Sequence, residues 1–411
     1  MKTAIVLGGT VPHIGLIQEL KSRGYFVVLA DYLPNPPAKR YADEHVSVST
    51  LDVERIVELA ESKNAELVIS TCIDQANSVC CKAAEILGLP SPYSYETSLD
   101  VTDKSRMKRI FIENGIPTSK YVSANSVDCI DWSRIEYPSV VKPVDCNSSK
   151  GVKKVDSEEE AKAAFIEALS FSRTKTALVE GYVDGIEIQV DCYASADDAV
   201  IVMTRQKKQL DRSISAELNS EGSVIPAPIL DGDNDQVKEI ARKIAKAFGL
   251  KNTPFFFQAI VDKTGRVNVL EFAPRIGGGL SFYLLQQIVG YDSIAVAVDS
   301  FLGNVPVIEL KQPAHFYGTN LIYMQEGVFG SISGIDSSLA DGLIKDYFLY
   351  KERGEHVGAE LRSGNRVGAF IVEADSLDEL ADKEARVWQR IKVLDPNGNE
   401  IMRREVSDSM L

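Results

Sequence analysis

Several features that mark other classes of protein are absent from this 411-residue sequence. No apolar run approaches the 18 residues that a membrane-spanning helix needs, and the apolar stretch at residues 3–7 is too short for the core of a signal peptide. The six cysteines include no C-x-x-C pair, and the four histidines are scattered. A disulfide framework or a zinc site is therefore not expected, and we expect a cytoplasmic protein with reduced thiols and no membrane partner.

Positive charge is also in deficit. The formal net charge is −14 and the isoelectric point is about 5.0, which argues against a general binder of nucleic acid or of anionic membranes. A local basic pocket for a small anion remains compatible with this balance. The composition, with 45% hydrophobic and 25% charged residues, is that of an ordinary globular protein, and the length predicts two to four domains.

The first 90 residues alternate between predicted strands and predicted helices. Because apolar strand runs alternate with helical patterns, we expect a parallel, doubly wound, Rossmann-like sheet. A Gly8-Gly9-Thr10 turn follows the first strand, but Pro12 and His13 interrupt the full dinucleotide-binding fingerprint, so a nicotinamide site is disfavoured. The strand ends still form the crevice in which such sheets bind ligands, and the residues expected there are Gly9, Thr10, Asp31, Cys72 and Asp74.

Composition divides the rest of the chain. Residues 90–98 are predicted to be a linker, residues 99–115 carry a helical pattern, and residues 119–122 and 139–144 are predicted to form a strand pair. Strands and helices are then predicted up to about residue 306, and a tail of strands with one helix at 376–391 follows. The expected domains are 1–98, 99–310 and 311–411, with a sub-domain at about 118–186, so the fold class is α/β combined with α+β.

A predicted β-hairpin at residues 255–273 carries the most specific chemistry. Residues 255–262 and 267–273 are strand-like, and the four residues between them include Gly265. If Asp262 pairs with Val267, Gln258 lies opposite Glu271, and alternation places Ala273 and Arg275 on the same face. Two oxygen donors beside a guanidinium are suited to Mg²⁺ and phosphate. The alternative is a hairpin whose polar face is merely solvated.

Further candidate residues precede the hairpin in a definite order. Lys104 opens a helix, Lys142 ends an apolar strand, and a loop of small residues follows at 147–151. Both lysines can neutralise the phosphates of ATP, and backbone N–H groups of the loop can wrap them. Glu180 with the backbone after it can bind adenine, and Glu187 can accept from ribose hydroxyls. Each feature alone is commonplace, and their order is what is informative.

In these features the chain resembles the ATP-grasp superfamily, which includes biotin carboxylase, D-alanine–D-alanine ligase, phosphoribosylglycinamide synthetase and carbamoyl-phosphate synthetase. The resemblance implies an ATP-grasp fold with a Rossmann-like N-terminal domain, a lid at about 118–186 and a small mixed C-terminal domain. It implies ATP and Mg²⁺ (or Mn²⁺) as cofactors. The implied roles are Lys104 and Lys142 on the phosphates, Ser148, Ser149, Lys150 and Gly151 over the γ-phosphate, Glu180 and Val183 at adenine, Glu187 at ribose, Gln258 and Glu271 on the metal, and Arg275 and Lys142 in catalysis.

Two positions depart from the usual family pattern. Many members have glutamate in place of Gln258 and asparagine in place of Ala273, so metal binding should depend largely on Glu271 and on ATP itself. The substrate side is expected to use Gly9, Thr10, Asp74, Gly277, Gly278 and Lys208, the last as part of a basic cluster with Arg205, Lys207 and Arg212. Arg366 is expected near the site.

The resemblance implies a ligase that joins a carboxylate to an amine through an acyl phosphate, such as an amino-acid ligase. A phosphoribosylglycinamide synthetase-like or carbamoyl-phosphate synthetase-like ligase is the alternative within enzymes, and a non-catalytic ATP-binding protein is the alternative outside them. The expected partners are small molecules, not nucleic acid, and the expected assembly is a homodimer.

Overall fold

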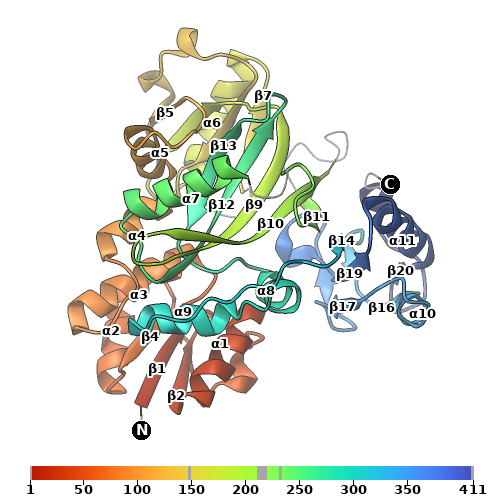
Figure 1. The fold of residues 1–411 in the computed structure, drawn as a ribbon, viewed down its shortest axis with the longest axis horizontal. Coiled ribbons are helices and arrows are strands. Elements are labelled where there is room, and N and C mark those ends of the chain that lie inside the picture. The colour runs from red at the N-terminus through yellow and green to blue at the C-terminus, as the bar shows by residue number, and fades with distance from the viewer. Residues whose placement is uncertain (1, 147–149, 211–219, 231–233, 409–411) are drawn as a thin grey trace.

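The structure, a computed structural model, describes residues 2–146, 150–210, 220–230 and 234–408. Figure 1 shows three groups of elements: the N-terminal sheet at the bottom, a small sheet with helix α6 at the top, and the C-terminal elements to the right. A large antiparallel sheet connects these groups.

The N-terminal group confirms the predicted parallel sheet. Its four strands pair in the order β3-β2-β1-β4, and every register between them is parallel. Residues 3–7 of the central strand are buried, as expected for a strand covered on both faces. The elements are β1 (Lys2–Leu7), α1 (Val11–Ser22), β2 (Tyr25–Ala30), β3 (Glu44–Val46), α2 (Val53–Ser62), β4 (Leu67–Ile69) and α3 (Asp74–Leu87).

A helix from much later in the chain completes this core. The apolar residues Ile294, Val298 and Phe301 of α9 (Ser293–Leu302) are buried in the same cluster as the strands of the N-terminal sheet. Arg23 at the end of α1 forms an ion pair with Asp299 of α9, with Nη1 2.5 Å from Oδ1. The N-terminal sheet is thereby held against the central part of the chain.

The upper group is a four-stranded antiparallel sheet in the order β5-β8-β6-β7, and α6 packs on it. The strands predicted around 119–122 and 139–144 are both present, but they do not pair with each other because β8 lies between them. The elements are β5 (Tyr121–Ala124), β6 (Ser139–Pro143), β7 (Lys153–Val155), α6 (Glu158–Phe171) and β8 (Ala177–Gly181).

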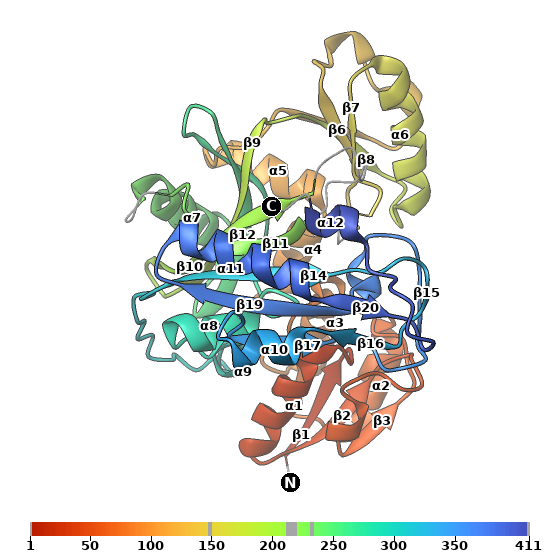
Figure 2. The same ribbon diagram turned by 90° about the vertical axis from the view of Figure 1, so that its right-hand side faces the viewer.

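The large sheet has eight strands in the order β13-β12-β9-β10-β11-β14-β19-β17. Three strands of the C-terminal tail therefore extend the same sheet as the predicted hairpin, and α11 packs across β14 and β19 (Figure 2). The strands are β9 (Gly185–Ala194), β10 (Ala199–Gln209), β11 (Ser220–Ile225), β12 (Thr253–Asp262), β13 (Val267–Ala273), β14 (Phe316–Ile322), β17 (Asp346–Leu349) and β19 (Gly368–Ala374).

Helices and short ladders complete the chain. The remaining helices are α4 (Tyr95–Thr102), α5 (Lys104–Glu113), α7 (Asp235–Ala247), α8 (Ser281–Val289), α10 (Ile335–Ala340), α11 (Leu377–Arg390) and α12 (Arg404–Asp408). Two small ladders pair β15 (Gly327–Val328) with β18 (His356–Val357) and β16 (Ser331–Ser333) with β20 (Lys392–Leu394). Within the described residues, no helix combines the length and apolar character needed to cross a bilayer.

The segment at 90–115 differs from its prediction. Part of the expected linker is helical, because α4 begins at Tyr95, and the helical pattern of 99–115 is interrupted at Asp103. The Asp103 carboxylate accepts from the backbone N–H groups of Ser105 (2.8 Å) and Arg106 (3.1 Å) and so starts α5 afresh. This break places Lys104 in the first turn of a new helix.

The hairpin has the predicted strands and the predicted pairing of Gln258 with Glu271, but it reaches that pairing by another route. Val261, not Asp262, pairs with Val267, so the register near the turn is shifted by one residue. A bulge between Gln258 and Ala259 then absorbs one extra residue of β13 and restores the predicted pair.

Candidate active site

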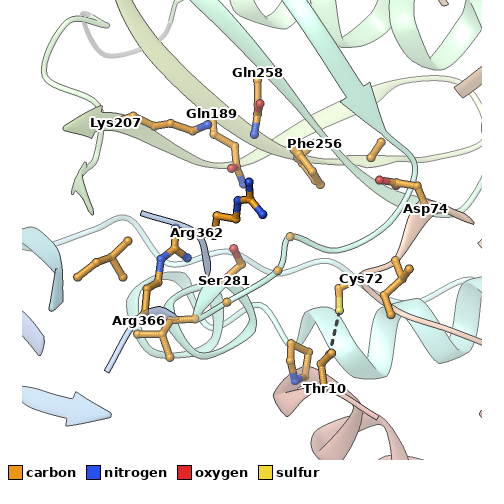
Figure 3. Close-up of a pocket in the computed structure, with 18 of the residues that line it drawn as sticks. Thr10, Cys72, Asp74, Gln189, Lys207, Phe256, Gln258, Ser281, Arg362 and Arg366 are labelled. Carbon is orange, nitrogen blue, oxygen red and sulfur yellow. Dashed lines mark hydrogen bonds between the residues drawn. The ribbon is translucent and has the colours of Figure 1, made fainter. Parts of the chain in front are cut away.

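A cavity of about 1830 Å³ opens between the three groups of elements, and one face of the large sheet forms its floor. Alternate residues of the strands face it because side chains alternate along a strand. Figure 3 shows Gln189, Lys207 and Gln258 on this floor, Thr10, Cys72 and Asp74 from the N-terminal group, and Arg362 and Arg366 from the C-terminal tail. The floor residues are Glu187 and Gln189 of β9, Arg205, Lys207 and Gln209 of β10, Ser223 of β11, Phe256, Gln258 and Ile260 of β12, and Glu271 and Ala273 of β13.

Glu271 and Gln258 lie together on this floor, surrounded by lysines. Lys104 Nζ is 3.3 Å from Glu271 Oε2. The Gln258 amide satisfies both its groups when its nitrogen donates to Glu271 Oε1 (3.2 Å) and its oxygen accepts from Lys207 Nζ (3.1 Å). The predicted pair is thus one carboxylate and one amide, which lie between the ammonium groups of Lys104 and Lys207.

The lysines keep the Glu271 carboxylate ionised. Burial raises its pKa, but Lys104, Lys142 and Lys207 lower it by more, so the pKa lies below its ordinary value. Burial likewise lowers the pKa of Lys104, and Glu271 raises it by more, so Lys104 stays charged. An ionised carboxylate next to an amide is an oxygen donor set that fits Mg²⁺, which takes few protein ligands and keeps water and phosphate oxygens. Among the described residues, no three His, Cys, Asp or Glu side chains form a metal-binding group.

Arg275 is committed to a partner that the sequence did not indicate. Its Nε is 2.6 Å from Asp74 Oδ1, its Nη2 is 2.7 Å from Asp74 Oδ2, and the guanidinium lies 5.0 Å from the centre of the Phe256 ring. This bidentate pair joins α3 to the segment after the hairpin. In this structure the predicted substrate contact Asp74 and the predicted phosphate contact Arg275 therefore bind each other, and both line the cavity.

Glu180, the predicted adenine contact, lines the cavity and is held there by two lysines and a serine. Its Oε1 is 2.5 Å from Lys142 Nζ, and its Oε2 is 2.6 Å from Lys108 Nζ and accepts from Ser119 Oγ (2.7 Å). Burial raises the pKa of Glu180, but the two lysines lower it well below its usual range. Both carboxylate oxygens are in use, so Glu180 positions Lys142 at the wall of the cavity.

The remaining nucleotide-binding predictions fall in three groups. Ser148 and Ser149 lie outside the described residues, as does Arg212 of the basic cluster. Lys150 lies 5.0 Å from the centre of the Phe171 ring, and Gly151 adopts a left-handed φ of +73° beside that ring. Val183 and Glu187 line the cavity, where Glu187 forms an ion pair with Lys207.

Two of the predicted substrate contacts do not reach the cavity. Lys208 points to the opposite face of β10, where its Nζ is 2.6 Å from Glu384 Oε2 of α11 and 3.0 Å from Asn320 Oδ1. Because side chains alternate along β10, the neighbouring Lys207 is the lysine that faces the cavity. Gly9 lies behind Thr10, and its N–H donates to Asp31 Oδ2 (2.7 Å), so Asp31 holds the turn and is buried.

Gly277 and Gly278 line the cavity as predicted, but they are not equivalent. A Cβ at Gly277 would lie 2.5 Å from Ser281 Oγ and 2.9 Å from Ser281 Cβ, whereas a Cβ at Gly278 would meet nothing within 4 Å. Ser281 Oγ accepts from Arg205 Nη1 (3.1 Å), and Arg205 Nη2 is 2.6 Å from Asp191 Oδ2. Only a glycine at 277 lets the loop approach this network.

We predict that Gly277→Ala destabilises the protein by about 1–3 kcal/mol, the usual cost of overpacking a filled site. Gly278→Ala is the matched control and should change stability by less than about 0.5 kcal/mol. Urea unfolding of both variants measures the difference. Equal stability of the two variants would contradict the contact at Gly277.

No sequence pattern indicated the pairing of Arg275 with Asp74, or of Lys108 and Lys142 with Glu180, since each joins distant segments. A signal for Lys207 over Lys208 was present, because the alternation Arg205, Lys207, Gln209 follows from β10. Arg362 was missed, while Arg366, expected near the site, lines the cavity. Arg366 Nε donates to Tyr323 Oη (2.9 Å), and neither arginine forms an ion pair within the described part of the chain.

Comparison with known proteins agrees with this architecture. Residues 135–282 match the ATP-grasp domain family. Formate-dependent phosphoribosylglycinamide formyltransferase of Mycolicibacterium gilvum is 30% identical over 173 residues, which are 40% of this chain and 43% of that protein. The protein of that name from Ignicoccus hospitalis is 24% identical over 412 residues, covering 95% of this chain and 96% of that protein. The crystal structure of an L-amino acid ligase from Bacillus licheniformis has a TM-score of 0.77 at 19% identity, covering 96% of this chain and 99% of that one.

The chain therefore carries an ATP-grasp domain, and the ATP-grasp fold extends over nearly its full length. The predicted fold class is confirmed. The match to the Mycolicibacterium protein spans less than half of that relative. Likeness at these identities establishes the fold, while the substrates must be inferred from the chemistry of the cavity.

Proposed function

We propose that this chain is an ATP- and Mg²⁺-dependent ligase that joins a carboxylate to an amine through an acyl phosphate. The observation that carries the proposal is the convergence of Lys104, Lys142 and Lys207 around the ionised Glu271 at the floor of one large cavity. These lysines can neutralise a polyphosphate, and they keep the Glu271 carboxylate ionised, which is the form that can help hold a cation. The ATP-grasp domain match and the L-amino acid ligase of the same fold are consistent with it.

The roles of the residues follow from where they lie. Lys104 and Lys142 would bind the phosphates, Glu271 and Gln258 would hold Mg²⁺, and Val183 with Glu187 would receive the nucleoside. For Gln258 this requires its amide to turn, since its nitrogen now faces Glu271. When bound, Mg²⁺ would neutralise phosphate charge during transfer.

The reaction balances without a protein nucleophile. A carboxylate oxygen of the substrate attacks the γ-phosphorus, the bond to the bridging oxygen breaks, and ADP leaves. The amine nitrogen then attacks the acyl carbon, phosphate leaves with the bonding pair, and the nitrogen loses a proton. Each step needs positioning and charge neutralisation, which the lysines supply.

A phosphorylated amine substrate, as in a phosphoribosylglycinamide synthetase-like ligase, is the second candidate. It is favoured by Arg362 and Arg366, which line the cavity and form no ion pair among the described residues. Guanidinium groups of this kind bind phosphate or carboxylate. A homodimer in the cytoplasm remains the expected assembly and location.

The test is MgATP consumption by the pure protein with pairs of carboxylates and amines, including amino acids and phosphoribosylamine. We expect phosphate release only when both partners are present. ATP binding without turnover on any pair would favour the non-catalytic alternative, and absence of ATP binding would refute the proposal.

A further inference from the structure

A chain of four hydrogen-bonding groups runs from the N-terminal sheet to the cavity. Ser70 Oγ donates to the backbone oxygen of Leu7 (2.7 Å), His13 Nε2 is 3.3 Å from Ser70 Oγ, and His13 Nδ1 is 2.8 Å from Thr10 Oγ1. Ser70 and His13 are buried, whereas Thr10 lines the cavity (Figure 3). None of the roles proposed above uses His13.

Proton counting assigns a direction to this chain, because the tautomer of His13 decides which groups donate. A carbonyl oxygen only accepts, so the single Ser70 hydroxyl proton is used on Leu7, and His13 Nε2 must carry a proton to donate to Ser70. Burial lowers the pKa of His13 to about 4 and outweighs the opposing effect of hydrogen bonds to the backbone of Leu7 and Thr10, so the ring is neutral near pH 7 and has one N–H, which the Ser70 contact assigns to Nε2. His13 Nδ1 is therefore bare, and the Thr10 hydroxyl donates to it.

Thr10 Oγ1 consequently has only lone pairs to offer to the cavity. Thr10 is the N-cap residue of α1, yet its side chain makes no capping hydrogen bond, so its oxygen is not used by the helix. Cys72 Sγ lies 3.6 Å away, and burial raises the pKa of this thiol, which keeps it protonated. An S–H is a weak donor that a stronger N–H donor would displace.

The backbone is shaped to admit the histidine ring. Gly8 has a left-handed φ of +98°, and a Cβ there would lie 3.1 Å from His13 Cε1 and 2.8 Å from Ile73 Cδ1. A side chain at this position would be strained by the left-handed φ and would crowd both Ile73 and the His13 ring. The hydrogen bonds of His13 with Ser70 and Thr10 therefore depend on the glycine turn at Gly8.

We propose that Thr10 Oγ1 accepts an N–H hydrogen bond from the amine substrate, and that His13 is the positioning residue that keeps this oxygen an acceptor. The inference rests on the proposed ligase function. A carboxylate carries only acceptors and would face the lone pairs of Thr10. The part of the cavity beside Thr10 therefore selects the amine, and the carboxylate would bind where lysine and arginine side chains line the cavity. An amine that donates one N–H here keeps its own lone pair free to attack the acyl carbon.

Two measurements test this proposal, and the first does not depend on turnover. In ¹⁵N NMR spectra of the full chain, with the His13 signals assigned by their loss in His13→Gln, we expect a protonated Nε2 and a bare Nδ1. L-Alaninamide, an amine without a carboxylate, should shift the Nδ1 signal, and N-acetyl-L-alanine, a carboxylate without an amine, should not. The opposite tautomer, or a shift with N-acetyl-L-alanine alone, overturns the proposal.

The second measurement uses the pair of substrates with the highest turnover. Thr10→Val removes the acceptor at nearly constant volume and should raise KM for the amine by about 10-fold, the loss expected for one hydrogen bond. KM for the carboxylate should change less than twofold, and Thr10→Ser should restore the amine KM. A larger effect on the carboxylate KM, or none on either, refutes the role of Thr10. Failure of the ligase function itself would appear separately, as absence of turnover in the unsubstituted protein.

Discussion

Replacing Glu271 by alanine will lower kcat for MgATP consumption by roughly 10²- to 10³-fold, the scale seen when one preorganised electrostatic group is lost. The reason lies in its surroundings. Lys104, Lys142 and Lys207 all act on this carboxylate, and the amide of Gln258 adds no charge. Without Glu271 the proposed Mg²⁺ site keeps only a neutral donor from the hairpin.

The matched control for this prediction is Glu352→Ala. Glu352 also lines the cavity, but it is exposed and belongs to the C-terminal tail. We expect its kcat to stay within twofold of the unsubstituted protein. Thermal unfolding of both variants must accompany the kinetics, because Lys104 is buried and loses its ion-pair partner in Glu271→Ala. Turnover that survives in a folded Glu271→Ala variant would remove the metal assignment.

Local pattern predicted the hairpin and the parallel sheet because each is specified within a short segment. Alternation along β12 and β13, with Gly265 in the turn, was enough to place Gln258 opposite Glu271. The bulge was not predictable, since the extra residue of β13 has no sequence mark. The correct pair was reached because the error at the turn and the bulge cancel.

The contacts that local pattern did not indicate join groups from distant segments. Asp74 and Arg275 are 201 residues apart, and Lys208 and Glu384 are 176 residues apart. A charged residue at a strand end indicates a ligand-binding site only if no oppositely charged side chain pairs with it inside the protein. The topology of the fold decides whether such a partner lies nearby. The alternation of side chains along a strand is a local signal, and it would have favoured Lys207 over Lys208 as the residue that faces the cavity.

The ion triad of Lys108, Glu180 and Lys142 will be the most sensitive point for folding. We predict that Glu180→Leu lowers the free energy of unfolding by about 3–5 kcal/mol, the usual cost of removing one partner from a buried ion pair. Lys108 has no exposed side-chain surface, and burial already lowers its pKa even with Glu180 present. Without the carboxylate, the two lysine ammonium groups would lie close together with no opposite charge between them, and Lys108 would remain fully buried. Urea unfolding at pH 7 measures the loss.

The control and the pH dependence together separate this triad from ordinary surface charge. Glu58→Gln breaks the exposed pair with Arg55 and should cost no more than about 1 kcal/mol. The folded pKa of Glu180 is depressed, so its contribution is present above the unfolded pKa of about 4.3 and is lost as the pH falls below it. The gap between the unsubstituted protein and Glu180→Leu should therefore narrow in acid. A gap that is constant down to pH 3 would mean that the leucine side chain disrupts packing, and that the charge of Glu180 is not what stabilises the fold.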